Sequence, residues 1–525
     1  MFKPFWWVIG LSAAAGAFAQ PPAPIEVIQV VGVTPLGGDL DTDRIAANVQ
    51  TASADELRDR NALDLADFMK RGLGSVFVNE AQSNPLQPDV QYRGFVGSPL
   101  LGLPQGLAVY QDGVRVNEPF GDTVSWALIP ESAVESLYVV PGSNPLFGLN
   151  ALGGAIAVRT KDGFSNDDTR AEVTAGSFGR AGVQAETGGS FSDELGYFVT
   201  ASVLDEDGWR DYSPTDAEQI FAKLTSRGDN SRVDVSLTRV DTDLVGNGAA
   251  PEDLLELDRT AIFTWPDHTW NALTMLGVSG EQTASANITL RGNIYVRASD
   301  IDTLNGDDSD FVECAATPGF VCEEEDGAEE LVLDENGLPV AADDALIGGA
   351  VNRTSTEQDG AGFGLQADFT GDLGSRENRF TIGVAHDEAD VEFGASTELG
   401  ALDATRQAVG GGVFVGERFT GLETSTSSTG FYLSNTFTFG ERTALTVSGR
   451  YNRTHVVLED QIDDALDGDH TFERFNPAIG LTFGTEAVTF YASYSEANRT
   501  PSPVELTCAD EDDPCRLPNA FLADP

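Results

Sequence analysis

Basic residues are scarce in this chain of 525 residues, which has 31 Lys and Arg against 84 Asp and Glu, a formal net charge of −53. Because proteins bind nucleic acid largely by neutralising phosphates with Lys and Arg, we expect no nucleic-acid partner. After the first twenty residues no apolar run reaches about 18 residues, which excludes a membrane protein built from several helices. Only four histidines occur, and none lies in a His-Glu-x-x-His or Gly-x-Ser-x-Gly pattern. We therefore expect neither an enzyme nor a resident metal or cofactor.

The first residues have the features of a secretory signal peptide. A lysine precedes an apolar stretch over residues 5–11, and the Ala-Phe-Ala triplet at 17–19 fits the small-residue cleavage rule. The alternative, a buried N-terminal helix, is disfavoured because the stretch is short and two prolines follow it. The sequence thus predicts that residues 1–19 are removed and that the mature protein leaves the cytoplasm.

The four cysteines form two close pairs in acidic, loop-like segments, Cys314 with Cys322 and Cys508 with Cys515. In an oxidising compartment such local pairs predict two small loop disulfides. A metal site is the weaker alternative, because no histidine lies near either pair and the spacings are not those of a Cys-x-x-Cys site.

A short β-prone segment, residues 25–33, follows the signal peptide without a hairpin turn of its own. Gly37-Gly38 and a polar stretch to Arg44 separate it from the next region. A single strand on a flexible tether is a candidate for adding itself to the sheet edge of another protein. The alternative is an ordinary first strand of the next domain.

The region over residues 45–163 has the pattern of a small mixed α/β domain. A helix start with capping residues begins at Ser53, and an amphipathic helix is expected between Asn61 and Gly72. Short strands follow, joined by turns rich in Gly, Pro, Asn and Asp. The length suits one globular domain.

From about residue 164 onward the sequence is a succession of alternating strands. In residues 431–439, for example, large apolar side chains alternate with serine and threonine. A soluble sandwich also alternates. A membrane barrel is favoured because the segments reach roughly ten residues, aromatic residues gather near their ends, and tight turns alternate with long polar loops.

Three ordered motifs support a more specific interpretation. They are Gln91-Tyr92-Arg93-Gly94-Phe95, Tyr110-Gln111-Asp112-Gly113-Val114-Arg115 and the stretch Phe-Gly-Leu-Asn-Ala-Leu-Gly-Gly-Ala-Ile at 147–156. With these motifs the second region resembles the plug of TonB-dependent outer-membrane receptors, and the third resembles their barrel. The resemblance implies an all-β transmembrane antiparallel β-barrel with a small N-terminal α/β plug domain.

The resemblance also implies a division of the chain and a set of site residues. The signal peptide would be 1–19, the TonB box and its linker 20–44, the plug 45–163 and the barrel 164–525. The implied TonB box is Glu26, Val27, Ile28, Gln29 and Val30. The implied plug-motif residues are Arg93, Gly94, Asp112, Gly113, Gly148, Gly153 and Gly154. Ligand-facing residues are expected in plug loops, at Gln87, Asn117, Phe120 and Trp126. In the family, arginines such as Arg93 and Arg159 meet acidic residues of the barrel wall; the alternative is that they are exposed surface arginines.

The function implied by the resemblance is import of a scarce ligand across the outer membrane of a bacterium. A ferric siderophore or another metal chelate is the expected ligand, and the TonB complex of the inner membrane would supply the energy. The expected partners are therefore TonB, outer-membrane lipid and a small molecule. The alternative is a non-transporting outer-membrane protein that binds or adheres.

Two further features bear on this interpretation. The family barrel has about 22 strands, whereas roughly 14 candidate strands occur here before the chain ends in loop-like sequence. We therefore expect a chain without the last third of the barrel.

Residues 302–344 contain many Asp and Glu and no Lys or Arg. This predicted extracellular loop could capture cations or a cationic ligand, or its charge could serve only solubility or binding to surface lipid.

Overall fold

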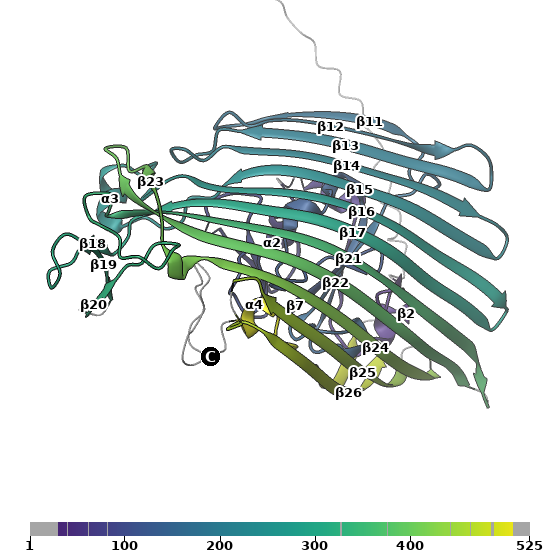
Figure 1. The fold of residues 1–525 in the computed structure, drawn as a ribbon. Helices are drawn as coiled ribbons and strands as arrows, with labels where there is room; N and C mark the ends of the chain where they lie inside the picture. Colours follow the sequence, from purple (N-terminus) through teal and green to yellow (C-terminus); the bar gives the residue numbers. More distant parts are fainter. Residues whose placement is uncertain are drawn as a thin grey trace, which may run out of the picture.

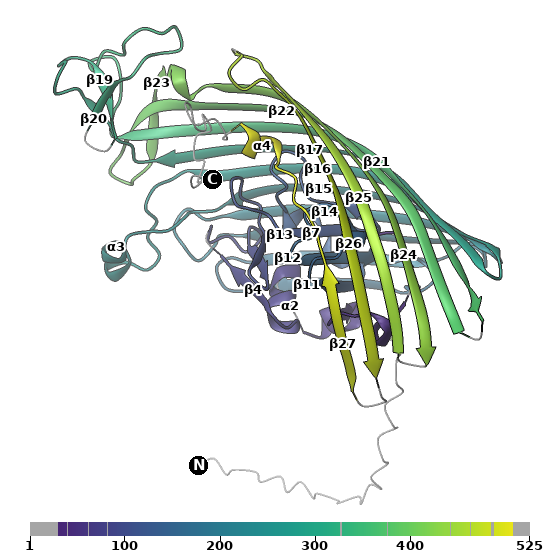
Figure 2. The ribbon, with the colours of Figure 1, turned by 90° about the horizontal axis from the view of Figure 1, so that it is seen from below.

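A computed structural model describes residues 30–507, apart from 39, 61, 63, 81, 326–327, 375, 441–442, 463 and 485–487. The signal peptide, residues 26–29 of the expected TonB box and the pair Cys508 and Cys515 lie outside the described residues. The chain forms a small N-terminal domain, the plug, and a wide curved sheet, the wall, which wraps around one side of the plug (Figures 1 and 2).

The plug has two short helices, α1 (Ala54–Asp59) and α2 (Leu65–Gly72). Each begins at a side chain that accepts a hydrogen bond from a free backbone N–H of the first turn. Ser53 forms a reciprocal capping box with Glu56, and Asp64 accepts from the N–H of Asp67. The expected helices are therefore present.

The plug strands form two sheets. A five-stranded sheet has the order β3-β9-β10-β7-β8, in which β10 and β7 are parallel and the other pairs are antiparallel. Its strands are β3 (Gln50–Ser53), β7 (Leu107–Gln111), β8 (Val114–Arg115), β9 (Val134–Pro141) and β10 (Gly154–Thr160). A smaller sheet contains β4 (Val76–Asn79), β5 (Asp89–Tyr92) and β6 (Phe95–Gly97). Apolar side chains are buried on both faces of the larger sheet, with Leu137 and Phe147 as examples from the two faces.

The wall is a 14-stranded sheet in which every strand except β23 follows the previous one as an antiparallel neighbour. Its strands are β11 (Thr169–Ala175), β12 (Ala181–Ser190), β13 (Leu195–Glu206), β14 (Thr215–Arg227), β15 (Ser231–Val245), β16 (Asp267–Ser285), β17 (Ile288–Asp307), β21 (Gly349–Leu373), β22 (Arg376–Leu402), β23 (Ala408–Phe414), β24 (Thr420–Gly440), β25 (Thr443–Asp460), β26 (Gly468–Gly484) and β27 (Thr489–Ser495). β23 pairs only with β22, as a branch at one end of the sheet. β11 and β27 are the two edges of the described sheet (Figure 2).

The two faces of the wall have opposite polarity. In β24, Phe431 and Leu433 are exposed on the outer face, whereas Tyr432, Ser434 and Thr436 are buried on the face towards the plug. Alternation follows from the two-residue period of a strand. An apolar outer face and a polar inner face are the pattern of a membrane barrel rather than of a soluble sandwich. Among the described residues, no helix has the length and apolar character that a membrane crossing requires.

The connections at the two ends of the wall differ in length. One end, the short-turn end, has turns such as 191–194 and 228–230. The other, the long-connection end, includes 246–266 with α3 (Glu252–Leu257), 308–348 and 403–419 (Figure 1). Within the connection 308–348, β18 (Phe311–Glu313), β19 (Val321–Glu325) and β20 (Ala328–Leu331) form a small sheet. The disulfide between Cys314 and Cys322 spans it and confirms the first predicted pair.

The segment before the plug lies against the wall. β1 (Val30–Val31) and β2 (Leu40–Asp41) form a small antiparallel pair, and the turn between them contacts β21. Thr34 donates a hydrogen bond to Gln366 of β21 at 2.7 Å. Residue 30, the one described residue of the expected TonB box, is thus four residues from a buried contact with the wall.

Candidate functional site

Ion pairs between buried or half-buried side chains join the plug to the wall. The plug residue is named first in each of the following pairs: Asp112 with Lys223 (3.0 Å), Lys161 with Glu186 (2.7 Å), Asp162 with Arg232 (2.7 Å) and Glu118 with Arg297. These partners come from β12, β14, β15 and β17, so one side of the plug is held across several strands. Charged groups that are buried with their partners fix a relative position, because separating them leaves an uncompensated charge.

The motif residues Asp112 and Gly113 form the turn between β7 and β8. Both have a positive φ, 49° and 84°, which a tight hairpin turn requires and which glycine adopts without strain. The Asp112 carboxylate accepts hydrogen bonds from Thr160 and faces Lys223. Burial acts to raise the pKa of Asp112, but Lys223 and Thr160 outweigh it and hold the pKa below its ordinary value. Asp112 is therefore an anionic contact with the wall as well as a turn residue.

The other motif residues lie in different structural environments. Gly148 has a φ of 91°, and a side chain there would meet Arg450 of the wall at 3.2 Å. Gly153 lies against Phe95, and Gly154 has a φ of 150°, while the turn residue Gly94 has a φ of 88°. The side chain of Arg93 is exposed and lies over the ring of its neighbour, Tyr92. Arg159 is also exposed. Neighbouring plug residues, Asp112 and Lys161, form ion pairs with the wall, a role for which the sequence did not single them out.

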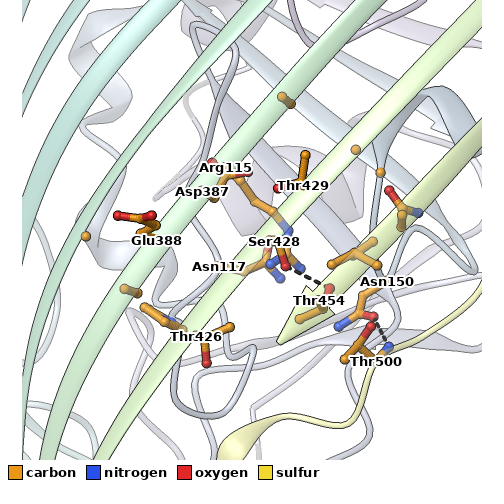
Figure 3. Close-up of a pocket in the computed structure, with 18 of the residues that line it drawn as sticks. Arg115, Asn117, Asn150, Asp387, Glu388, Thr426, Ser428, Thr429, Thr454 and Thr500 are labelled. Carbon is orange, nitrogen blue, oxygen red and sulfur yellow. Dashed lines mark hydrogen bonds between the residues drawn. The ribbon is translucent and has the colours of Figure 1, made fainter. Parts of the chain in front are cut away.

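A cavity of about 170 Å³, the deep cavity, lies between the plug turn at β8 and the strands β17, β21, β22, β24 and β25. Arg115 forms an ion pair with Asp122 on the plug side. On the wall side Tyr295 donates to Asp387 at 2.8 Å, and Figure 3 shows Arg115 and Asp387 among the side chains that line this cavity. Pro35 and Leu36 of the N-terminal segment line the same cavity. The segment that leads to the expected TonB box therefore borders the space between plug and wall.

A larger cavity of about 470 Å³, the outer cavity, lies nearer the long-connection end. Its plug side consists of residues from 82–87, 99–101 and 118–127, and its wall side comes from β16, β17, β21 and the connection 246–266. Ligand-binding cavities in proteins commonly have volumes of about 300–1,000 Å³. The outer cavity is thus the described space best suited to a small molecule.

A buried polar cluster separates the two cavities. Glu118 of the plug is paired with Arg297 of β17 and accepts hydrogen bonds from Ser299 at 3.2 Å and Gln358 at 3.0 Å. Arg297 also donates to the backbone carbonyls of Val116 and Asn117. Glu118 faces the outer cavity on one side of this cluster, and Arg297 lines the deep cavity on the other.

The four expected ligand-facing residues are distributed over the plug. Gln87 and Phe120 line the outer cavity. Asn117 lines the deep cavity, but its side chain is used to hold the plug hairpin, since it bonds to the backbones of residues 107, 109 and 122. Trp126 lies in the plug core at 4% exposure and donates to the Gly97 carbonyl at 2.9 Å. The structure thus brings only Gln87 and Phe120 together in the outer cavity.

The ligand-facing residues predicted from the sequence include no wall residue of the outer cavity. Asn271, Asn352 and Gln358 line it and are nearly fully buried. The available signal was the alternation of each strand, which places polar residues on one face. Alternation does not show which part of that face lies opposite the plug loops.

A second group of acidic residues, half-buried, lies at another side of the plug, near β11 and β12. Burial raises the pKa of Glu131 from 4.5 to about 8, and the carboxylates of Asp64 and Asp67 add to the shift. Burial also raises the pKa of Asp64, to about 6. Glu131 is therefore protonated in the folded plug under conditions where an exposed glutamate is ionised.

Family models match both parts of the chain. The TonB-dependent receptor plug domain matches residues 41–155, and the TonB-dependent receptor-like β-barrel matches residues 208–519. The chain belongs to the TonB-dependent receptor family. This confirms the resemblance that the three motifs indicated, and it confirms the expected fold class of an antiparallel β-barrel wall with an N-terminal plug.

Solved structures of ferric-chelate receptors and transporters have the same fold. The ferric citrate transporter FecA in its unliganded form has a TM-score of 0.69 at 13% identity, over 88% of this chain and 64% of its own. BauA, the ferric preacinetobactin receptor of Acinetobacter baumannii, has a TM-score of 0.66 at 14% identity, over 88% and 65%. The ferric-catecholate import receptor Fiu of E. coli K12 has a TM-score of 0.68 at 13% identity, over 90% and 73%. This chain therefore spans less than two thirds of the length of FecA and BauA. No curated protein sequence matches it significantly.

Proposed function

We propose that this protein is an outer-membrane receptor that binds a small ligand in the outer cavity and imports it with energy supplied through TonB. The family membership carries the proposal, together with a cavity formed jointly by plug loops and wall strands. The apolar outer face of the wall is suited to lipid, and the polar inner face is suited to a lumen. A ferric siderophore or another metal chelate is the proposed ligand class, since FecA, BauA and Fiu handle such ligands.

The proposed route of energy runs through the N-terminal segment. Residues 26–30 would pair with TonB by strand addition, in which backbone hydrogen bonds supply most of the affinity. The same segment continues through Thr34 to Leu36, which borders the deep cavity, and then into the plug. A pull on residues 26–30 would therefore act first on the pairing of β1 with β2 and then on the contact between Thr34 and Gln366.

Deletion of residues 26–31 tests the proposal. In cells that express the chain, uptake of a radiolabelled ferric chelate should be abolished, while binding of the chelate at the cell surface should remain. A matched control replaces residues 21–24 by an equal number of alanines and should leave uptake intact. Unchanged uptake after the deletion would refute the assigned TonB box.

A non-transporting receptor is the second candidate function. It would bind the same ligand, but neither the deletion nor collapse of the proton-motive force would change the amount of ligand associated with cells. The two functions are therefore separated by the same uptake measurement.

A further inference from the structure

Three cavities follow one another along the inner face of β17. The third cavity has a volume of about 350 Å³ and lies near the short-turn end, where the plug, the wall and the N-terminal segment all line it. From that end onward, Arg291 lines the third cavity, Tyr295 the deep cavity and Thr303 the outer cavity. Even numbers of positions separate these residues, so their side chains share one face of the strand. The cavities therefore form a series between the two ends of the wall, next to the plug.

The turn in the N-terminal segment separates the third cavity from the deep cavity. Pro35 and Leu36 line both cavities, as does Gly113 at the tip of the plug hairpin. Within the turn, the backbones of Thr34 and Gly37 exchange two hydrogen bonds of 3.0 Å. The partition between the two cavities thus includes the segment that leads to the expected TonB box.

Two glycines leave the space that the side chain of Leu36 fills. A Cβ atom added at Gly113 of the plug would lie 3.5 Å from Cδ2 of Leu36, and one added at Gly364 of β21 would lie 3.1 Å from Cδ1. Gly364 pairs with Asn293 of β17, and both residues line the deep cavity. Leu36 therefore spans the gap between plug and wall at a point where these two glycines contribute no side chain.

The two sides of this gap are held more firmly than the turn. Asp112, next to Gly113, is paired with Lys223 of β14 at 3.0 Å and accepts a hydrogen bond from the N–H of Thr160 at 2.9 Å. Gly364 lies within a strand that is paired on both sides. The turn contacts the wall through the neutral hydrogen bond from Thr34 to Gln366. Because breaking a buried ion pair costs more than breaking a neutral hydrogen bond, a pull from the N-terminus should move the turn before the hairpin.

We propose that the turn over residues 34–37 is the lower barrier of a passage between plug and wall, that Leu36 closes it, and that a pull on the expected TonB box removes it directly. The inference rests on the proposed function and deepens it, because it names the residue that must move. Withdrawal of residues 30–37 joins the deep and third cavities and adds the space that the turn had filled. The plug hairpin keeps its ion pair with the wall during this step.

Thiol labelling of the purified full chain in detergent tests the barrier. Ser428 lines the deep cavity (Figure 3), and Ser428→Cys reports the access of N-ethylmaleimide to it. Added to this variant, Leu36→Ala should raise the labelling rate at least about tenfold, because it opens the gap to the third cavity. Leu40→Ala is the matched control: it removes the same atoms from the same segment, but Leu40 lines neither cavity, and labelling should stay at the rate of Ser428→Cys alone.

The chain without Ser428→Cys gives the background rate of labelling. Equal rates in the Leu36→Ala and Leu40→Ala chains would show that Leu36 does not close the deep cavity, and would overturn the inference.

Mechanical pulling on the N-terminus tests which part moves first. The full chain, inserted in a lipid bilayer, is pulled by an N-terminal tag in an atomic force microscope. We expect a first event that lengthens the chain by about 5 nm, the extended length of residues 30–44. An oxidised disulfide in Leu36→Cys with Gly364→Cys ties the turn to β21 and should abolish this event.

The matched control for pulling is a disulfide in Ala46→Cys with Gly480→Cys. The Cβ of Ala46 lies against the position of a Cβ at Gly480, so this bond ties the start of the plug to β26 and leaves the turn free. The first event should remain in the control. A first event that the Leu36–Gly364 disulfide leaves unchanged, or that the control disulfide abolishes, would overturn the inference.

Failure of these tests and failure of the proposed function are distinguishable, because neither measurement uses TonB or a ligand. Loss of uptake after deletion of residues 26–31, together with equal labelling of the Leu36→Ala and Leu40→Ala chains, would support the importer and refute the barrier. Faster labelling of the Leu36→Ala chain and a first event blocked by the Leu36–Gly364 disulfide, without any dependence of uptake on residues 26–31, would support the barrier and refute the importer.

Discussion

The plug and the wall differ in the direction in which their apolar side chains point. The plug packs apolar side chains inwards, as at Leu137 and Phe68, which are 0% and 1% exposed. The wall turns apolar side chains outwards, as at Phe431 and Leu433, which are 57% and 47% exposed. Both therefore present polar groups where they meet. The plug–wall interface combines these ion pairs and hydrogen bonds with small apolar clusters, in which Phe120, Val114 and Ala133 of the plug pack against apolar side chains of the wall.

The largest expected effect comes from a substitution in the apolar core of the plug. Leu137→Asp places a charge without a partner in the plug core and should destabilise the plug by more than about 4 kcal/mol. We expect protease to cleave the plug of this variant, whereas the wall should remain folded in cold detergent. Leu257→Asp is the control, because Leu257 is 86% exposed in α3 and its replacement should change stability by less than about 0.5 kcal/mol. A protease-resistant plug in Leu137→Asp would show that plug and wall do not differ in this way.

The next effect concerns the interface itself. Arg297→Met leaves Glu118 buried without its partner and should destabilise the docked plug by about 3–5 kcal/mol. The double variant Arg297→Met with Glu118→Gln removes both charges and should recover most of the loss. The measurement is thermal unfolding of the purified chain. A double variant no more stable than the single one would show that packing, and not the buried charge, holds the plug at this point.

A smaller effect depends on pH. The folded protein keeps the Glu131 proton to about pH 8, whereas the unfolded chain loses it near 4.5. Between these values the folded state binds more protons, so stability falls as pH rises, and the full loss is reached above about pH 8. Glu131→Gln removes this loss and should raise the free energy of unfolding by about 2 kcal/mol at high pH. Below the unfolded pKa the variant should lose this advantage.

The measurement for Glu131 is thermal unfolding of wild type and variant across this pH range. Glu505→Gln is not a suitable control, because Glu505 caps α4 (Pro503–Leu506). Glu256→Gln, in the connection that contains α3, is suitable. A constant difference between wild type and Glu131→Gln at all pH values would contradict the raised pKa.

The smallest expected effect concerns a pair on the exposed rim. Arg474 and Glu496 form an ion pair at 3.3 Å with half-exposed or exposed side chains. Arg474→Ala should change stability by less than about 1 kcal/mol, because solvent screens such pairs. Together with Arg297→Met it compares an exposed pair with a buried one. Similar losses of stability in both variants, measured by thermal unfolding, would show that burial does not determine how much each ion pair stabilises this protein.

Much of the fold could be predicted from local patterns. The capping box at Ser53, the turn at Asp112-Gly113 and the alternation in residues 431–439 all depend on neighbours in the chain, and all are present in the structure. The disulfide of Cys314 with Cys322 was predictable for the same reason, since only a short loop separates the two residues.

The lining of the outer cavity was predicted less well because it depends on contacts distant in the chain. Trp126 occurs in a plug loop with the composition of a binding loop, yet its indole N–H is satisfied by Gly97 inside the plug core. Glu118 lies in the same loop region, and only its distance to Arg297, 179 residues later, shows that it divides two cavities. No local pattern contains such a pairing.

The sequence by itself determined the family, the order of plug and wall, the strand alternation and the short-range turns, because these follow from motifs and from the two-residue period of a strand. The tertiary structure alone decided which polar residues of the wall face the plug loops and which plug residues reach them. These contacts join residues that are distant in the chain, such as Glu118 and Arg297. Only the folded arrangement brings such partners together, because no local pattern of the sequence contains both.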